Sequence, residues 1–421
     1  MCFVAKINKY IIRGEPMNEN YIKKIVINEV RHLRKVTIDL GDEFRHLILT
    51  GSNGSGKTSV LKFLSEVIEG QQKSYLNIKS NSNIPKISNI MGSFSNSFES
   101  SAINENNDDI NISKLIKSPN EPINIVFSKN ENEIYRDCIF IYLPSKRYDL
   151  KESSTFRELK IPLNSKYLIE KSLGVDYIDY MKYLHFYAKS VVAKEYRNEI
   201  NNIGSWFDFI ESILRKIFND EHLSLSFAPE LWTFRIETKN RNPFTHHEMA
   251  DGHSVCFKLF MEIMMRFHFR IDEPFNPNVP CILLVDEIDI HLHVEMQRNI
   301  LPLLTSIFQN IQIIATTHSP FVISSSKNSI TYDLESQNIL EEPHLRSYQS
   351  IIETHYDIGL YSKITLGMFN RYKELYQKQV LTTDEENEIE NLASELIKTP
   401  PSSSELYLAI NEMEVNRKQH I

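Results

Sequence analysis

Eight residues near the N-terminal end form the pattern with the most specific chemistry in this chain, G-x-x-x-x-G-K-T. The apolar run His46 to Thr50 precedes them and predicts a buried strand, and the residues after them have helical spacing. A strand, a glycine-rich turn and a helix are the setting that a phosphate-binding loop requires. The glycines let backbone N–H groups point at an anion, and the helix adds its positive N-terminal end. The predicted binding residues are Gly51, Ser52, Asn53, Gly54, Ser55, Gly56, Lys57, Thr58 and Ser59.

Two side chains of this loop have separate expected roles. Lys57 is placed to reach the β- and γ-phosphates of a nucleotide, and the Thr58 hydroxyl is placed to ligate Mg²⁺. The alternative interpretation is a glycine-rich turn that binds nothing, and it leaves the flanking strand and helix unexplained. We therefore expect ATP and Mg²⁺ as cofactors.

A second pattern, Leu283-Leu284-Val285-Asp286-Glu287, ends an apolar run with two carboxylates. Carboxylates at the end of a buried strand need partners. With a phosphate loop upstream, the pattern assigns Asp286 to the Mg²⁺ shell and Glu287 to activation of the attacking water. The alternative is a solvated acidic turn.

A third pattern follows the next apolar run, Ile311 to Thr316, and reads Thr317-His318-Ser319-Pro320. Ligands bind at the carboxyl ends of parallel strands, so His318 should emerge at the same edge of the sheet as the loop and the carboxylates. There it would sense the γ-phosphate or position the water, and we predict Lys57, Glu287 and His318 as the catalytic residues. A structural histidine is the alternative.

These patterns need a sheet and helices to position them. Continuous apolar strands at 281–285 and 311–316, joined by a helix at 295–308, indicate a parallel sheet covered on both faces. Earlier strands at 22–30 and 35–40 predict a small antiparallel piece, and the first helix should end near Gly70, where the composition changes. Further expected elements are strands at 123–127, 138–143, 223–227 and 231–237, and helices at 254–269, 350–379, 384–397 and 403–417.

Composition narrows the class of protein. The chain has 421 residues, 47 Lys and Arg, 55 Asp and Glu, and a net charge of −8, so its overall charge does not indicate nucleic-acid binding. Its four cysteines are far apart and form no C-x-x-C pair, which favours a reducing cytoplasm and argues against structural zinc. No apolar run reaches the length of a membrane span.

In their order, the phosphate loop, a long insertion, LLVDE and THSP resemble the ATP-binding-cassette-type ATPases of the SMC and RecF class. Within it the chain is similar to the AAA15 and AAA21 families, relatives of the OLD nucleases and of the ATPase subunits of the Septu and PARIS anti-phage systems. The resemblance covers most of residues 20–330. It implies an α/β fold, a P-loop NTPase of the ABC-ATPase type, with a mixed sheet core, antiparallel N-terminal strands, an inserted helical lobe and a helical C-terminal region.

The resemblance also implies a signature loop that contacts the γ-phosphate bound by a second subunit. Ala250, Asp251 and Gly252 stand where this loop belongs, although Ala250 replaces the family's hydroxyl residue. Asp289-Ile290-His291-Leu292-His293 resembles the family's E-x-H-L-H-P run at the subunit interface, with a metal site at the two histidines as the alternative. The stretch from Leu143-Pro144 to Arg147 resembles the family's L-P-x-x-R run, which implies that Arg147 contacts a phosphate or the subunit interface. The alternative is a surface arginine.

The resemblance and the motifs lead to one functional expectation. The chain is expected to be a cytoplasmic ATPase that dimerises through ATP, or forms a larger homo-oligomer, and regulates a separate effector, most plausibly a nuclease, in anti-phage defence. The region after residue 330 reads as helices without the acidic strands of a nuclease, so no built-in nuclease is expected. Alternatives are a RecF- or SMC-like DNA-repair ATPase that binds DNA directly, a transporter subunit and a non-hydrolysing scaffold.

The expected organisation has six parts. They are the first part of the ATPase core at 20–70, an Asn- and Ser-rich insertion at 71–135, a core strand and loop at 136–164, a helical lobe at 165–220, the second part of the core at 221–335, and a helical region for assembly or partner binding at 345–421.

Overall fold

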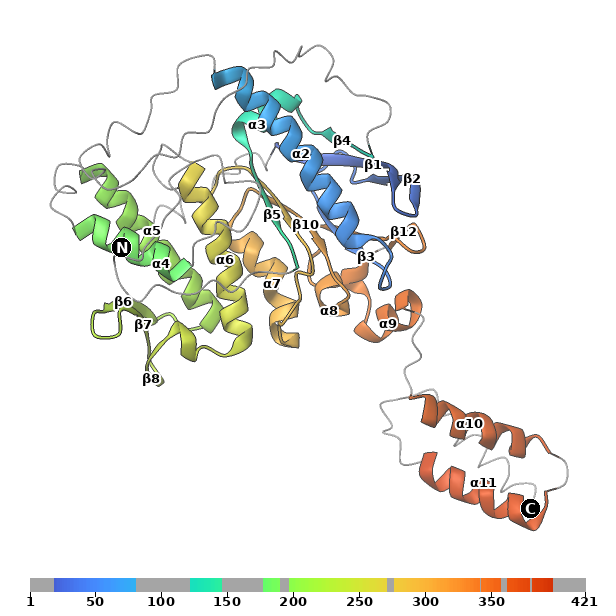
Figure 1. The fold of residues 1–421 in the computed structure, drawn as a ribbon. Coiled ribbons are helices and arrows are strands. Elements are labelled where there is room, and N and C mark those ends of the chain that lie inside the picture. The colour runs from blue at the N-terminus through green and yellow to red at the C-terminus, as the bar shows by residue number, and fades with distance from the viewer. Residues whose placement is uncertain are drawn as a thin grey trace. The chain divides into compact units, whose positions relative to one another are not determined.

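The structure, a computed structural model, describes residues 19–80, 122–145, 177–189, 197–270, 276–340, 342–356, 362–378 and 381–396. The chain divides into two compact units, residues 1–346 and 347–421. The first unit contains all the strands, and the described part of the second is helical (Figure 1). Within the described residues, no helix is both long enough and apolar enough to cross a lipid bilayer.

A six-stranded mixed sheet forms the centre of the first unit, in the order β12-β11-β3-β10-β9-β5. Five of the strands run parallel, and β12 at one edge is antiparallel. Every residue of β3, β9 and β10 is buried, as the continuous apolar runs predicted. The strands are β3 (His46–Thr50), β5 (Ile139–Leu143), β9 (Cys281–Val285), β10 (Ile311–Thr316), β11 (Ser329–Asp333) and β12 (Asn338–Leu340).

A separate antiparallel sheet comes from β1 (Ile22–Val30), β2 (Leu33–Asp39) and β4 (Ile123–Phe127), in the order β2-β1-β4. The helix after the phosphate loop, α2 (Lys57–Ser80), contacts strands of both sheets and shares one hydrophobic core with them. The buried Gln312 side chain of β10 also joins the two sheets. Its amide oxygen accepts from Ile22 N at 2.8 Å, and its nitrogen donates to the carbonyls of Ile22 at 2.9 Å and Arg45 at 2.8 Å.

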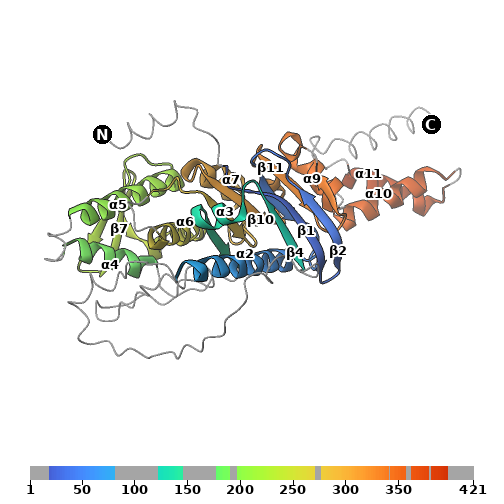
Figure 2. The same cartoon turned by 90° about the horizontal axis from the view of Figure 1, so that it is seen from above.

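The remaining helices of this unit pack around the sheet and in a lobe beside it (Figures 1 and 2). Helix α6 contacts β5, α7 and the two lobe helices, and the lobe carries the antiparallel sheet β6-β7-β8. Trp206 is fully buried in the lobe and makes an edge-to-face contact with Tyr180. These elements are α3 (Glu131–Asp137), α4 (Tyr177–Lys189), α5 (Arg197–Phe218), β6 (Ser224–Ala228), β7 (Thr233–Thr238), β8 (Arg241–Thr245), α6 (Asp251–Arg270), α7 (Val294–Ile307) and α8 (Pro320–Ile323).

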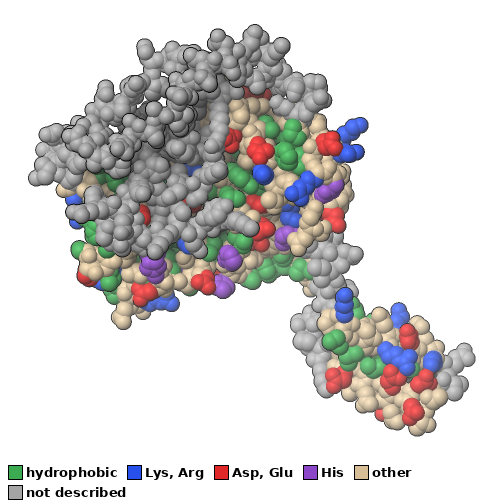
Figure 3. Space-filling view, viewed as in Figure 1, with side chains coloured by type: hydrophobic (Ala, Val, Ile, Leu, Met, Phe, Trp, Pro, Cys, Tyr) green, Lys and Arg blue, Asp and Glu red, His purple; other side chains and the backbone are tan. Residues whose placement is uncertain are grey.

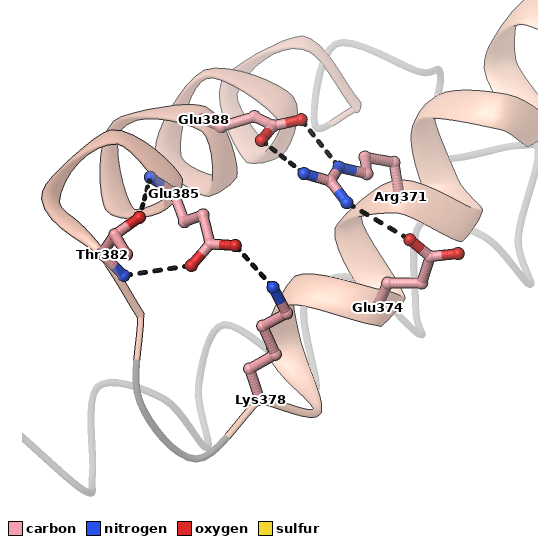
Figure 4. Close-up of polar contacts among 6 residues, drawn as sticks. All are labelled: Arg371, Glu374, Lys378, Thr382, Glu385 and Glu388. Atoms are coloured by element: carbon pink, nitrogen blue, oxygen red, sulfur yellow. Dashed lines mark hydrogen bonds and ion pairs between the residues drawn. The ribbon is translucent and has the colours of Figure 1, made fainter.

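The second unit contains α9 (Tyr348–Tyr356), α10 (Lys363–Tyr376) and α11 (Thr383–Leu396). Helices α10 and α11 pack through a small core that includes Tyr372 and Ile389. Charged pairs cross between the same two helices (Figure 4), where Arg371 binds both carboxylate oxygens of Glu388 at 2.8 and 2.9 Å. Lys378 and the backbone N–H of Thr382 bind Glu385 and lower its pKa to about 2.

Most expected elements occur near their expected bounds, and three expectations were wrong or incomplete. Helix α2 continues through Gly70 to Ser80, because a glycine in a helix costs only about 1 kcal/mol and does not end it. The single helix expected at 350–379 is two helices, and Ser362 caps the second by accepting the N–H of Thr365 at 3.1 Å. The strands β8, β11 and β12 and the short helices α3 and α8 were not foreseen, and the helix expected at 403–417 lies outside the described residues.

The strand that carries the phosphate loop begins with a buried histidine, His46, whose Nδ1 accepts the N–H of Ile313 on β10 at 3.1 Å. Burial lowers its pKa from 6.5 to about 4. A histidine with a lowered folded pKa stabilises the fold fully above pH 6.5, and that stability is lost as the pH falls toward 4. We therefore expect this residue alone to cost about 2 kcal/mol of unfolding free energy between pH 7 and pH 5.

Urea denaturation at both pH values measures this effect. His46→Asn is the matched variant, because the asparagine oxygen can accept the same N–H and does not titrate. Its loss of stability on acidification should be smaller than that of the wild type by about 2 kcal/mol. Equal losses in the two proteins would contradict the assignment.

Candidate active site

Three predicted motifs meet at one edge of the central sheet because of the strand order. Strand β10 lies between β3 and β9, and all three run parallel. The phosphate loop follows β3, Thr317 and His318 follow β10, and Asp286 and Glu287 follow β9. The sequence predicted that these motifs emerge at one edge.

The phosphate loop has a backbone that only glycine adopts readily. Gly51 has φ 134° and Gly56 has φ 99°. Gly51 is also closely surrounded, because a Cβ placed on it would lie 2.7 Å from the Oγ of Ser55 and 3.0 Å from a carboxylate oxygen of Asp333. Both the backbone angle and the space therefore require glycine at Gly51.

Lys57 is the first residue of α2, and its ammonium group folds back over the loop. It donates to the carbonyls of Gly51 at 2.8 Å and Ser52 at 2.9 Å. Burial lowers the pKa of Lys57, and the nearby carboxylates, Asp286 and Glu287 first among them, oppose that shift. These carboxylates favour the charged form, which is the form that attracts phosphate.

Asp286 is the most buried acidic group of the site, with 1% of its surface exposed. One of its oxygens, Oδ1, accepts from the hydroxyl of Thr316 at 2.7 Å and from that of Thr58 at 3.2 Å. The other, Oδ2, is buried and has no hydrogen-bond partner within the described residues. A buried carboxylate oxygen without a donor is a favourable place for a cation.

This arrangement fits the Mg²⁺ that the motifs imply. Mg²⁺ in nucleotide sites is usually held by one or two protein oxygens, phosphate oxygens and water, not by a cage of side chains. Thr58 and Asp286 supply such oxygens next to each other. The described residues contain no cluster of three His, Cys, Asp or Glu side chains that could hold a metal by themselves.

Glu287 has an unusual backbone conformation for its position. Its φ is 49°, in the left-handed region that costs a non-glycine residue roughly 1 kcal/mol or more. Its N–H donates to the Thr316 hydroxyl at 2.7 Å, which holds this conformation in place. The partly exposed Glu287 is therefore fixed at its backbone, beside the buried Asp286.

The loop that carries His318 is fixed on both sides of it. The Thr317 hydroxyl donates to Asp289 at 2.5 Å, and the Ser319 hydroxyl donates to the Gln297 side chain at 2.8 Å. Burial lowers the pKa of His318, and repulsion by Lys57 lowers it further, while Asp289 partly opposes both. His318 is therefore neutral at pH 7 and able to exchange hydrogen bonds at this edge.

Sequence reasoning missed three residues of the site. Thr316 joins Asp286 to the backbone of Glu287, although the sequence shows it only as the last residue of a strand. Glu335, in the turn between β11 and β12, accepts the N–H of Ser52 at 3.1 Å, and Asp333 accepts the N–H of Glu335 at 2.9 Å. Polar and apolar residues alternate from Ser329 to Asp333, and a polar turn follows them. This pattern could have revealed the hairpin.

The predicted signature-like residues lie elsewhere in the first unit. Ala250 and Asp251 are exposed at the beginning of α6, and Gly252 is buried against His293. In Figure 1 the beginning of α6 lies apart from the beginning of α2, where the phosphate loop is. The structure therefore does not bring these residues together with the phosphate loop of the same chain. Arg147 lies outside the described residues.

The double role of Thr316 can be tested with Thr316→Val, which keeps the shape and removes the hydroxyl. Asp286 then loses a donor and the N–H of Glu287 loses its acceptor, a cost of about 1–3 kcal/mol. We expect ATP turnover to fall roughly 10- to 100-fold. Thr331→Val on β11 is the matched control, because its buried hydroxyl has no hydrogen-bond partner within the described residues. Equal turnover in the two variants would exclude the role.

Comparison with known proteins gives relatives that match different shares of the chain. The "Retron Ec83 probable ATPase" of Escherichia coli is 35% identical over 105 residues, which are 25% of this chain and 18% of that protein. The "Septu protein PtuA" of Bacillus thuringiensis is 21% identical over 311 residues, 72% of this chain and 73% of that protein. The matched region is therefore less than a fifth of the retron protein's length.

A crystal structure of an Smc head bound to the C-terminal winged-helix domain of ScpA matches 76% of this chain and 96% of its own, at 14% identity. Its TM-score is 0.37, too low to support an inference.

The match to a protein family is more extensive. Residues 47–324, more than half of the chain, match the family AAA_21, described as "AAA domain, putative AbiEii toxin, Type IV TA system". This stretch contains the phosphate loop, both carboxylates and His318. The chain therefore belongs to the AAA_21 family of ATPases.

Proposed function

We propose that this chain is an ATP-driven switch, which closes against a second copy of itself around ATP and thereby controls a separate effector in anti-phage defence. The observation that supports dimerisation is the separation of the two parts of the site. Lys57, Asp286, Glu287 and His318 meet at one sheet edge, whereas Ala250–Gly252 lie at the beginning of another helix. In a head-to-tail dimer, the second part would come from the partner subunit.

Each residue of the sheet edge has a role in the proposed hydrolysis. The N–H groups of the loop and Lys57 bind the phosphates, and the Thr58 and Asp286 oxygens would hold Mg²⁺, which would supply positive charge beside the phosphates. Glu287 orients the attacking water and accepts its proton. Neutral His318 offers a hydrogen bond to the γ-phosphate or the water from the adjacent strand end.

Two observations favour a role in defence. The chain resembles the ATPase subunits of anti-phage systems in its motifs, and relatives named as a Septu protein and as a retron ATPase match parts of it. The proposed effector is a separate protein, most plausibly a nuclease, and the helices of the second unit are the proposed region for binding it or for assembly. ATP would then hold the two subunits together at their interface, and its hydrolysis would let the subunits separate.

The association state of Glu287→Gln tests the switch. This variant should bind ATP and retain it, because the carboxamide cannot accept the water's proton. Light scattering with Mg²⁺ and ATP should show at least a doubling of the mass, and no change without ATP. Adding Lys57→Ala to Glu287→Gln should abolish the response, since the phosphates lose their cation. A mass of Glu287→Gln that is independent of ATP would rule out the proposed switch.

A further inference from the structure

The backbone conformation at Gly252 does not require glycine. It is the second residue of α6 and has helical backbone angles, so alanine could adopt the same conformation and would stabilise the helix by about 1 kcal/mol. The reason for glycine is a neighbour. A Cβ at this position would lie 3.0 Å from Cδ2 of His293, closer than nearly all such contacts. Gly252 therefore permits the close approach of a side chain from another helix.

His293 is the residue that begins α7. It is the N-cap, and its carbonyl accepts the N–H of Gln297 at 2.9 Å. Its ring lies against α6 at Gly252, so the beginnings of the two helices meet at this contact. Histidine side chains are exposed on the face of the first unit that Figure 3 shows. His293 itself is exposed, as are Ala250 and Asp251 beside Gly252, so the contact lies next to the loop that the proposed dimer uses.

Gln297 links this contact to the loop of His318. Its side-chain nitrogen donates to the carbonyl of Leu292 at 2.7 Å, and its oxygen accepts the Ser319 hydroxyl at 2.8 Å. One side chain thus fixes the residue before His293 and the residue after His318. Its nitrogen and its oxygen each have a partner, so a displacement of Ser319 breaks a partly buried hydrogen bond or moves Leu292 with it.

A second connection runs beside the first. Asp289 accepts from Thr317, the residue before His318. Between Glu287 and His293 the chain makes successive tight turns, in which Ile290 N donates to Glu287 O at 3.1 Å and Leu292 N donates to Asp289 O at 3.0 Å. His291 in this segment is also left-handed, with φ 59°. The segment is therefore short, contains left-handed residues at Glu287 and His291, and is held by hydrogen bonds along its length.

We propose that Gln297 and His293 are positioning residues that couple the nucleotide site of a subunit to its own signature-like loop. A change at the His318 loop on ATP binding is carried through Gln297 and residues 289–293 to the contact with Gly252, and so alters how that loop is offered to the partner. The inference rests on the proposed function for the use of the loop in dimerisation. The coupling itself is a property of one chain.

Hydrogen–deuterium exchange on dilute, monomeric protein tests the coupling without dimerisation. ATP with Mg²⁺ should slow exchange in a peptide from the phosphate loop and change exchange in the peptide 249–256. In Gln297→Met, which keeps the side-chain length and removes both hydrogen bonds, the first effect should remain and the second should fall at least about twofold. If ATP changes exchange in the peptide 249–256 as much in this variant as in the wild type, the inference is overturned. If ATP does not slow exchange in the phosphate-loop peptide of the wild type, nucleotide binding itself is refuted.

The contact at Gly252 has its own test, in the Glu287→Gln background. Gly252→Ala should weaken ATP-driven association by about tenfold, because the added Cβ displaces the His293 ring from its contact with α6. Gly204→Ala in α5 is the matched control, since a Cβ there meets nothing within 4 Å, and it should leave association unchanged. If Gly252→Ala associates with ATP as well as Gly204→Ala does, the contact with His293 carries no signal and the inference fails.

Discussion

The buried carboxylate of Asp286 is the group on which the arrangement of the active site depends. Placing a charge at the end of a buried strand is costly unless donors or a cation meet it. Here two hydroxyls meet one oxygen, one from the phosphate-loop helix and one from the end of β10. The other oxygen lacks a hydrogen-bond partner within the described residues. The same threonine that serves Asp286 also holds the backbone of Glu287. The cost of one buried charge thus fixes three motifs relative to each other.

The strand order explains why those donors are available. Because β10 lies between β3 and β9, Thr316 reaches Asp286, and His318 lies where burial first, and the charge of Lys57 second, lower its pKa. Gln312, on the same strand, binds the backbone of the antiparallel sheet. Strand β10 therefore connects the catalytic edge at its carboxyl end with the second sheet at its amino end. Its only polar residues are the ones that make these connections, Gln312 and Thr316.

The sequence allowed the central strands and the edge at which the motifs emerge to be predicted, because continuous apolar runs and G-x-x-x-x-G-K-T are strong signals. It did not reveal the role of Thr316, since a hydroxyl at a strand end gains meaning only from the register with the neighbouring strand. The hairpin of β11 and β12 was missed because β12 has three residues and weak periodicity. Likewise, the sequence placed Gly252 in the signature-like loop, but its contact with His293 depends on the packing of α6 against α7.

The position of β3 in the sheet has a consequence for how the protein is made. His46–Thr50 is synthesised before both of its neighbours in the sheet, Ile311–Thr316 and Ser329–Asp333, which follow more than 250 residues later. At about 5–20 residues per second, the apolar strand waits on the order of 15 to 60 seconds for its partners. Throughout that time its two edges are unpaired and prone to join other chains. The strand that precedes the phosphate loop thus gains both of its neighbours only after Asp333 has been made, and until then five apolar residues stay without their native pairing.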